Sequence, residues 1–308
     1  MADKIKYPIG IQTFLKIREE GYLYVDKTAL VHKLVKESSY VFLSRPRRFG
    51  KSLLVSTLQA YFEGRKELFA GLEIDKLEDE WIEYPVLRFD LSAAYYDEIE
   101  VLIDKLTSYL EDLEDEYSIN TSGQIGDRFR RLIRAVCRKT GRKVVILIDE
   151  YDKPLLDTMH DSELLEKIKG KLRGFYSVLK QCDEYIRFVM ITGVSKFGKV
   201  SVFSGLNNLK DISMNPAFND ICGITEQEFH SNFGPSLKIF AEHHEISDEE
   251  AAREFKAYYD GYHFARNGAD IYNPFSTLNA FDDNKLGAYW FATGSSSYLI
   301  CLLYTSPS

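Results

Sequence analysis

The fold and the chemistry of this chain follow from nine residues, Ser44-Arg45-Pro46-Arg47-Arg48-Phe49-Gly50-Lys51-Ser52. The short apolar run before them, Tyr40-Val41-Phe42-Leu43, is typical of a strand, and residues 53–62 carry apolar side chains at helical spacing. A strand, a turn ending in Gly-Lys-Ser and a helix form the layout of a phosphate-binding loop. Unpaired N–H groups and a partial positive charge at the start of such a helix attract phosphate oxygens.

We expect the loop and the first helical turn to hold a nucleotide through Arg47, Arg48, Phe49, Gly50, Lys51, Ser52 and Leu53. Gly50 lets the backbone approach the ligand, Lys51 neutralises the outer phosphates and the Ser52 hydroxyl ligates Mg²⁺. Arg45 stands where the usual pattern has a glycine, and Pro46 behind it favours extended backbone there. On the loop alone, a phosphate site and an ordinary strand-to-helix connection are equally open.

A second element favours the phosphate site. Residues 144–148 form an apolar run typical of a buried parallel strand, and Asp149 and Glu150 follow it directly. Ligands bind at the carboxyl ends of such strands. We therefore expect Asp149 to act on Mg²⁺ together with Ser52, directly or from the second coordination sphere, and Glu150 to be the general base for an attacking water. The alternative is a strand that ends in a solvated acidic turn.

Two other pairs of polar residues each allow two interpretations. Thr192 and Ser195 follow the strand-like stretch 186–191, at a place where side chains that sense the γ-phosphate or the attacking water would stand. The start of a polar loop explains them equally well. Asp26 and Lys27 precede a short amphipathic segment, where they would contact adenine or ribose or else belong to a surface turn that caps a helix.

Composition restricts the class of protein. The chain has 308 residues, 45% of them hydrophobic, and its net charge of −8 argues against a broad nucleic-acid-binding surface. Its four scattered cysteines lack metal-site spacing and are typical of reduced thiols. We find no apolar signal stretch and no run approaching the ~20 residues of a membrane span, and we therefore expect a cytoplasmic protein that does not enter a membrane.

The alternation of strand-like and helix-like segments predicts an α/β fold, a three-layer sandwich of the P-loop NTPase type with a mostly parallel sheet. After about residue 222 the sequence becomes helical, polar and rich in aromatic residues, with capping-box patterns at Thr225/Glu228 and Ser247/Glu250. We expect a P-loop ATPase domain over residues 1–222, a small helical lid domain over 223–300 and a non-native tail over 301–308.

Taken together, the motifs resemble the AAA-ATPase-like domain of many bacterial and archaeal proteins. They lie, in chain order, at residues 24–28 (Tyr-Val-Asp-Lys-Thr), 45–52, 148–152 (Ile-Asp-Glu-Tyr-Asp), 192–195 (Thr-Gly-Val-Ser), 203–209, 259–262 and 272–274. The resemblance implies that Arg45 is the family's own variation of the loop. It also implies that members usually continue into a restriction-endonuclease-like nuclease domain, so we expect this sequence to come from a truncated gene model.

These observations predict Mg²⁺-dependent binding of ATP and its hydrolysis. The alternative is a nucleotide-binding switch or scaffold that does not hydrolyse ATP and regulates an attached nuclease-like domain or a partner protein. A protein partner or self-association is open, and so is an action of the parent protein on nucleic acid. The source of an arginine finger is not assigned.

Overall fold

The computed structural model describes residues 5–289, and the expected tail at 301–308 lies outside this part of the chain. The strands are β1 (Tyr40–Ser44), β2 (Val86–Asp90), β3 (Val144–Asp149), β4 (Ile186–Gly193), β5 (Lys210–Asp211), β6 (Ile224–Thr225) and β7 (Ile271–Tyr272). The helices before β4 are α1 (Phe14–Glu19), α2 (Thr28–Glu37), α3 (Lys51–Phe62), α4 (Ile99–Glu116), α5 (Ile125–Thr140), α6 (Lys153–Asp157) and α7 (Ser162–Gln181). Those after it are α8 (Lys199–Val202), α9 (Glu226–His244), α10 (Asp248–Tyr259) and α11 (Pro274–Asp282).

Five strands form one parallel sheet in the order β2-β3-β4-β1-β5. Because all five strands run the same way, their carboxyl ends meet at one edge of the sheet. In the register of neighbouring strands, Ser44 of β1 lies beside Gly193 of β4, and Ile148 of β3 lies beside Ile191 of β4. The loop between β1 and α3, the acids after β3 and the polar residues after β4 therefore start from adjacent positions.

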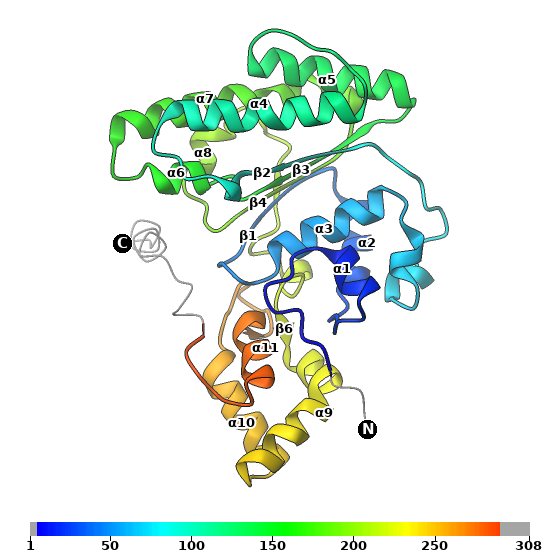
Figure 1. Ribbon diagram of the computed structural model, residues 1–308, viewed down its shortest axis with the longest axis vertical. Coiled ribbons are helices and arrows are strands. Elements are labelled where there is room, and N and C mark those ends of the chain that lie inside the picture. The colour runs from blue at the N-terminus through cyan, green and yellow to red at the C-terminus, as the bar shows by residue number, and fades with distance from the viewer. Residues whose placement is uncertain (1–4, 290–308) are drawn as a thin grey trace.

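Helices cover both faces of the sheet, as Figure 1 shows. Successive strand residues point to opposite faces, so Phe42 packs against the layer that contains α4, α5 and α7, while Val41 and Leu43 pack against the layer that contains α2 and α3. Every residue of β3 is buried, which is what a central strand between two helical layers requires. The structure confirms the α/β class and the parallel sheet.

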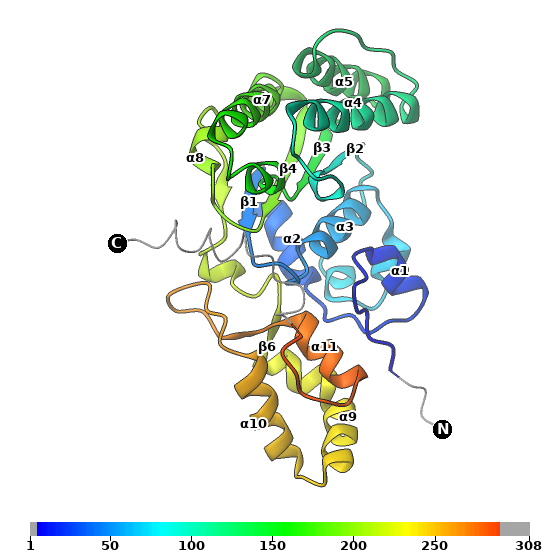
Figure 2. The same cartoon turned by 60° about the vertical axis from the view of Figure 1, so that its left-hand side comes forward.

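The chain after residue 222 forms a second, mainly helical part. In both views α9, α10 and α11 lie together at the end of the molecule opposite to α4, α5 and α7 (Figures 1 and 2). An aromatic cluster around Phe229, Phe233 and Phe281 forms its core. The capping box at the start of α9 is complete, because the Thr225 side chain accepts from the Glu228 N–H and the Glu228 carboxylate accepts from the Thr225 N–H.

The N-terminal segment joins this helical part rather than the sheet. The Tyr7 hydroxyl donates to Ser236 Oγ at 2.6 Å, and the Tyr7 ring lies against Phe233 and Phe281. Ile9 packs against the same cluster. A unit that would begin only at residue 223 therefore takes side chains from the first ten residues, although the proposed boundary at 222/223 stays a prediction.

Residues 272–274 look like a turn in sequence, but the Asn273 side chain accepts from the Ser276 N–H and caps α11, with Pro274 in its first turn.

In residues 5–289 no helix is long and apolar enough to cross a membrane.

Candidate functional site

The loop between β1 and α3 turns through two left-handed residues. Gly50, the N-cap of α3, has φ +89°, a conformation that glycine adopts without steric cost. Arg48 has φ +68° and its side chain is exposed, with the guanidinium 4.9 Å from the centre of the Phe275 ring. The loop thereby brings the first turn of α3 to the carboxyl edge of the sheet, with its N–H groups unpaired by the helix.

Lys51 and Ser52 form that first turn. Lys51 is buried, and its Nζ donates to the Pro46 carbonyl at 3.2 Å, so the ammonium folds back over the loop. Ser52 is half-buried and faces the same side. A lysine held over the loop and a hydroxyl at the helix start are the two side chains that the sequence pattern assigns to phosphate and Mg²⁺.

A cavity of about 400 Å³ opens at this turn. Its walls come from five segments of the chain: the N-terminal residues 8–12, the loop and start of α3, the residues after β2, the residues after β3, and the start of α11. Its charged lining consists of the cations Arg47, Arg48, Lys51 and Lys153 and the carboxylate Glu150. Although the chain as a whole carries a net charge of −8, this cavity has an excess of positive charge and suits a polyanion.

Asp149 lies behind the cavity at the end of β3. It is almost fully buried, and the Thr192 hydroxyl donates to its Oδ1. Within residues 5–289 its other carboxylate oxygen, Oδ2, is buried without a hydrogen-bond partner. An acidic oxygen left without a donor inside a protein is costly, and its presence at this edge points to a bound cation or water as its partner.

Glu150 lines the cavity directly, from a left-handed backbone at φ +53°. Burial raises the pKa of its carboxyl group, and the negative charges of Asp149 and Asp152 act in the same direction, while Lys51 opposes them. A non-glycine residue held at positive φ is strained, and such strain gathers where a side chain must point to one place. Here that place is the cavity next to Lys51.

Thr192 and Ser195 contact acids rather than the cavity. Thr192 donates to Asp149, and Ser195 Oγ donates to Asp152 at 3.0 Å. Asp152 also accepts from the backbone N–H groups of Val194 and Ser195, and it is completely buried. Neither hydroxyl belongs to the cavity lining, so both hold carboxylates in place, and their role as γ-phosphate sensors stays a prediction.

Arg45, which replaces the usual glycine, points away from the cavity. Its side chain is buried, and its guanidinium donates to the carbonyls of Ser213, Phe218 and Asn219 at 2.7–3.3 Å. The ring of Phe264 lies 4.0 Å from the guanidinium carbon. Burial lowers the pKa of this group. The arginine therefore fastens the start of the loop to the segment that leads into the helical part, and it does not line the charged cavity.

Phe49 lies on the opposite side of the loop from the charged cavity. It is buried against Tyr262 and Phe264, with ring centres 4.6 and 5.4 Å away. It also lines a second, apolar cavity of about 100 Å³ that shares several walls with the first. The shared residues are Pro8, Gly50, Leu53, Pro274 and Leu278. Phe49 therefore borders the second cavity, and Leu53 borders both.

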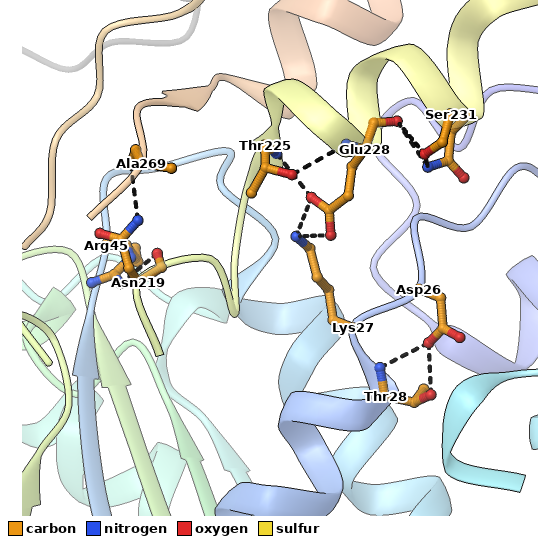
Figure 3. A network of polar contacts seen from close by, with 10 residues as sticks. Asp26, Lys27, Thr28, Arg45, Asn219, Thr225, Glu228, Ser231 and Ala269 are labelled. Carbon is orange, nitrogen blue, oxygen red and sulfur yellow. Dashed lines mark hydrogen bonds and ion pairs between the residues drawn. The ribbon is translucent and has the colours of Figure 1, made fainter. Parts of the chain in front are cut away.

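Asp26 and Lys27 have structural partners, as Figure 3 shows. Asp26 Oδ1 accepts from the N–H and hydroxyl of Thr28 at the start of α2. Lys27 Nζ contacts the Glu228 carboxylate at 2.5 Å and so joins the N-terminal part to the capping box of α9. Asp26 therefore bonds the first residue of α2 from one position before the N-cap, which is Lys27, and Lys27 also lines the apolar cavity.

The comparisons with known proteins agree with this geometry. Residues 8–203 match the family described as Predicted AAA-ATPase, a match that covers more than half of the chain. The chain belongs to this family. It is also 42% identical, over 300 residues, to a protein of Azotobacter chroococcum mcd 1 described as an uncharacterized protein in the vnfD 5'region. That alignment covers 97% of this chain and 56% of the relative, so the chain spans little more than half of the relative's length.

For this AAA-ATPase-like chain, sequence reasoning assembled the loop and the two acids but missed three neighbours of the site. Asp152 stood within a quoted motif without an assigned role, yet it is the most buried of the acids. Lys153 lines the cavity, and its position three residues after Glu150 was the available signal. Phe275 lies under Arg48 across more than 200 residues, and no local pattern indicates that contact.

Proposed function

We propose that this protein binds ATP together with Mg²⁺ in the charged cavity and hydrolyses it, as a P-loop NTPase with a helical lid. The observation that carries the proposal is the cavity itself. It joins an unpaired helix N-terminus, an excess of cations and a half-buried glutamate at positive φ at one edge of a parallel sheet. Membership of the AAA-ATPase-like family supports a nucleotide as the ligand.

The two cavities suit the two ends of a nucleotide. The phosphates would lie on the N–H groups at the start of α3, with Lys51 and Arg47 neutralising their charge. The base would enter the apolar cavity, where Tyr24, Phe49 and Leu53 offer hydrophobic surface. Because Leu53 and Gly50 border both cavities, one molecule can reach across.

The residues present fit a magnesium ion. Mg²⁺ prefers oxygen donors and is usually held by one or two carboxylates, waters and the substrate phosphates rather than by a full protein cage. Asp149 Oδ2, which has no partner among the described residues, and the Ser52 hydroxyl are such donors. No cluster of three or more His, Cys, Asp or Glu side chains suited to a metal is found in residues 5–289. When bound, the ion would neutralise charge on the outer phosphates.

Glu150 is the residue we assign to the attacking water. Its carboxylate would accept a proton or orient the water, and burial brings its pKa closer to neutrality than that of an exposed glutamate. Thr192 keeps Asp149 in place, and Ser195 keeps Asp152 in place. Hydrolysis would then depend mainly on positioning and charge stabilisation.

A second candidate is a nucleotide-dependent switch that does not hydrolyse ATP. The observation in its favour is the direct packing of the loop on the helical part through Arg45, Arg48 and Phe49. Ligand at the loop would bias the position of that part and, through it, a protein partner or a nuclease-like domain of a longer parent protein.

Calorimetric titration with ATP and Mg²⁺, beside a phosphate-release assay, tests both candidates. We expect the parent protein to bind ATP and release phosphate, Lys51→Ala to lose binding, and Glu150→Gln to bind without release. Lys167→Ala, which changes an exposed lysine on α7, is the control and should match the parent. Binding without release in the parent would select the switch, and absence of binding would refute both.

A further inference from the structure

We propose that Lys153 contacts the outermost phosphate of bound ATP and makes the site prefer a nucleoside triphosphate over a diphosphate. The inference rests on the proposed function and adds a residue to which the loop motif and the acidic motif assign no role. It is carried by where Lys153 stands along the cavity and by what surrounds its ammonium group.

Lys153 lines the wall of the charged cavity. It is the first residue of α6, and its N–H donates to the Glu150 carbonyl at 3.0 Å. Lys153, Glu150 and Ser92 line the charged cavity and not the apolar one. With the base in the apolar cavity and the inner phosphates on the loop, the last phosphate lies beside Glu150 and Lys153.

The ammonium group of Lys153 is positioned by Asp157 but keeps N–H donors for a ligand. Its side chain is 18% exposed, its Nζ pairs with Asp157 Oδ2, and the Tyr95 ring centre lies 5.6 Å from it. Asp157 also accepts from the Tyr96 N–H at 3.2 Å, which fixes the carboxylate. A lysine ammonium has three N–H donors, and the pair with Asp157 occupies one carboxylate oxygen, so donors are left for a ligand in the cavity.

A comparable pair on α7 shows what distinguishes Lys153. Lys167 and Glu163 have the same four-residue spacing, but their side chains are 57% and 80% exposed and line none of the cavities described above. Such a solvent-exposed pair adds little to stability. The side chains of Lys153 and Asp157 are only 18% and 12% exposed, so the Lys153 ammonium lies partly shielded from solvent at the wall of the cavity.

The test compares the affinities of the full chain for ATP and for ADP, both with Mg²⁺, in the parent, Lys153→Met, Lys153→Arg and Lys167→Met. A lost charged hydrogen bond to the last phosphate weakens binding by about tenfold or more. We expect Lys153→Met to weaken ATP by that factor and ADP by less than about twofold. Lys153→Arg should keep the preference for ATP, and Lys167→Met should behave as the parent.

Asp157→Asn separates ligand binding from a structural role, because it removes the same ion pair and leaves the lysine in place. We expect it to keep the preference for ATP. The inference is overturned if Lys153→Met weakens ATP and ADP equally or neither, or if Asp157→Asn reproduces the loss of preference. Failure of the parent to bind either nucleotide would instead refute the proposed function, so the two failures are distinguishable.

Discussion

Replacing Arg45 by glycine would restore the usual phosphate-loop pattern, yet we expect it to destabilise the protein. The guanidinium supplies the hydrogen bonds to the buried carbonyls of Ser213, Phe218 and Asn219, and it lies over the Phe264 ring. The variant loses all four contacts at once. The usual loop pattern therefore favours glycine at this position, whereas the stability of the fold favours arginine.

The magnitude follows from those contacts. Carbonyls left buried without a donor cost about 2 kcal/mol in total if water reaches some of them. The lost cation–π contact adds roughly 1 kcal/mol, and the backbone freedom of glycine adds about 0.5 kcal/mol. The sum, about 3.5 kcal/mol, is reduced because the variant no longer buries a charge, and we take a net loss of about 2.5 kcal/mol.

Urea-induced unfolding measures the difference. With a denaturant slope of about 2.5 kcal/mol per molar, a loss of about 2.5 kcal/mol moves the midpoint down by about 1 M. Arg48→Gly is the matched control, because Arg48 is exposed and has φ +68°, so relief of strain there offsets the lost contact with Phe275 and the midpoint should change little. If Arg45→Gly fails to fold, Arg45→Lys replaces it as the test. Lysine keeps the charge but lacks the guanidinium donors, so its urea midpoint should still lie below that of the parent. Equal midpoints for Arg45→Gly and the parent would refute the reasoning.

Three other outcomes are expected. Glu150 accepts a proton only when ionised, and burial raises its pKa above the ordinary value of 4.5. The rate of phosphate release should therefore begin to fall on acidification before the pH reaches 4.5. A rate that does not change between pH 8 and pH 4.5 would contradict this. A double-mutant cycle with Lys27→Met and Glu228→Gln should show a coupling of about 1 kcal/mol in urea unfolding, since the pair is partly buried, and zero coupling would count against the link. Gly223→Ala should lower the thermal midpoint, because φ is +96° and the new Cβ would overlap Ile271, whereas Gly170→Ala, in open space on α7, should raise it slightly.

Much of the fold could be predicted from short stretches of sequence. The apolar runs at 40–43, 144–148 and 186–191 indicated three central strands, and the structure confirms each of them. The Gly-Lys-Ser turn and the Asp149-Glu150 pair indicated one edge of a parallel sheet, because strands of this kind bring their carboxyl ends together. Each of these signals lies within a few neighbouring residues. Local backbone geometry is therefore enough to convert it into a strand or a turn.

The direction of Arg45 could not be predicted in this way. Its partners lie at residues 213–219 and 264, more than 160 positions away, and backbone carbonyls carry no mark in a sequence. The same holds for Tyr7, which packs on α9 and α11, and for Lys153, whose place in the cavity depends on α3 and α11 standing opposite. The sequence by itself determined the sheet, the loop and the two acids. The tertiary structure alone decided which side chains line the cavity and which fasten the loop, because burial and long-range carbonyl acceptors exist only once the layers have packed.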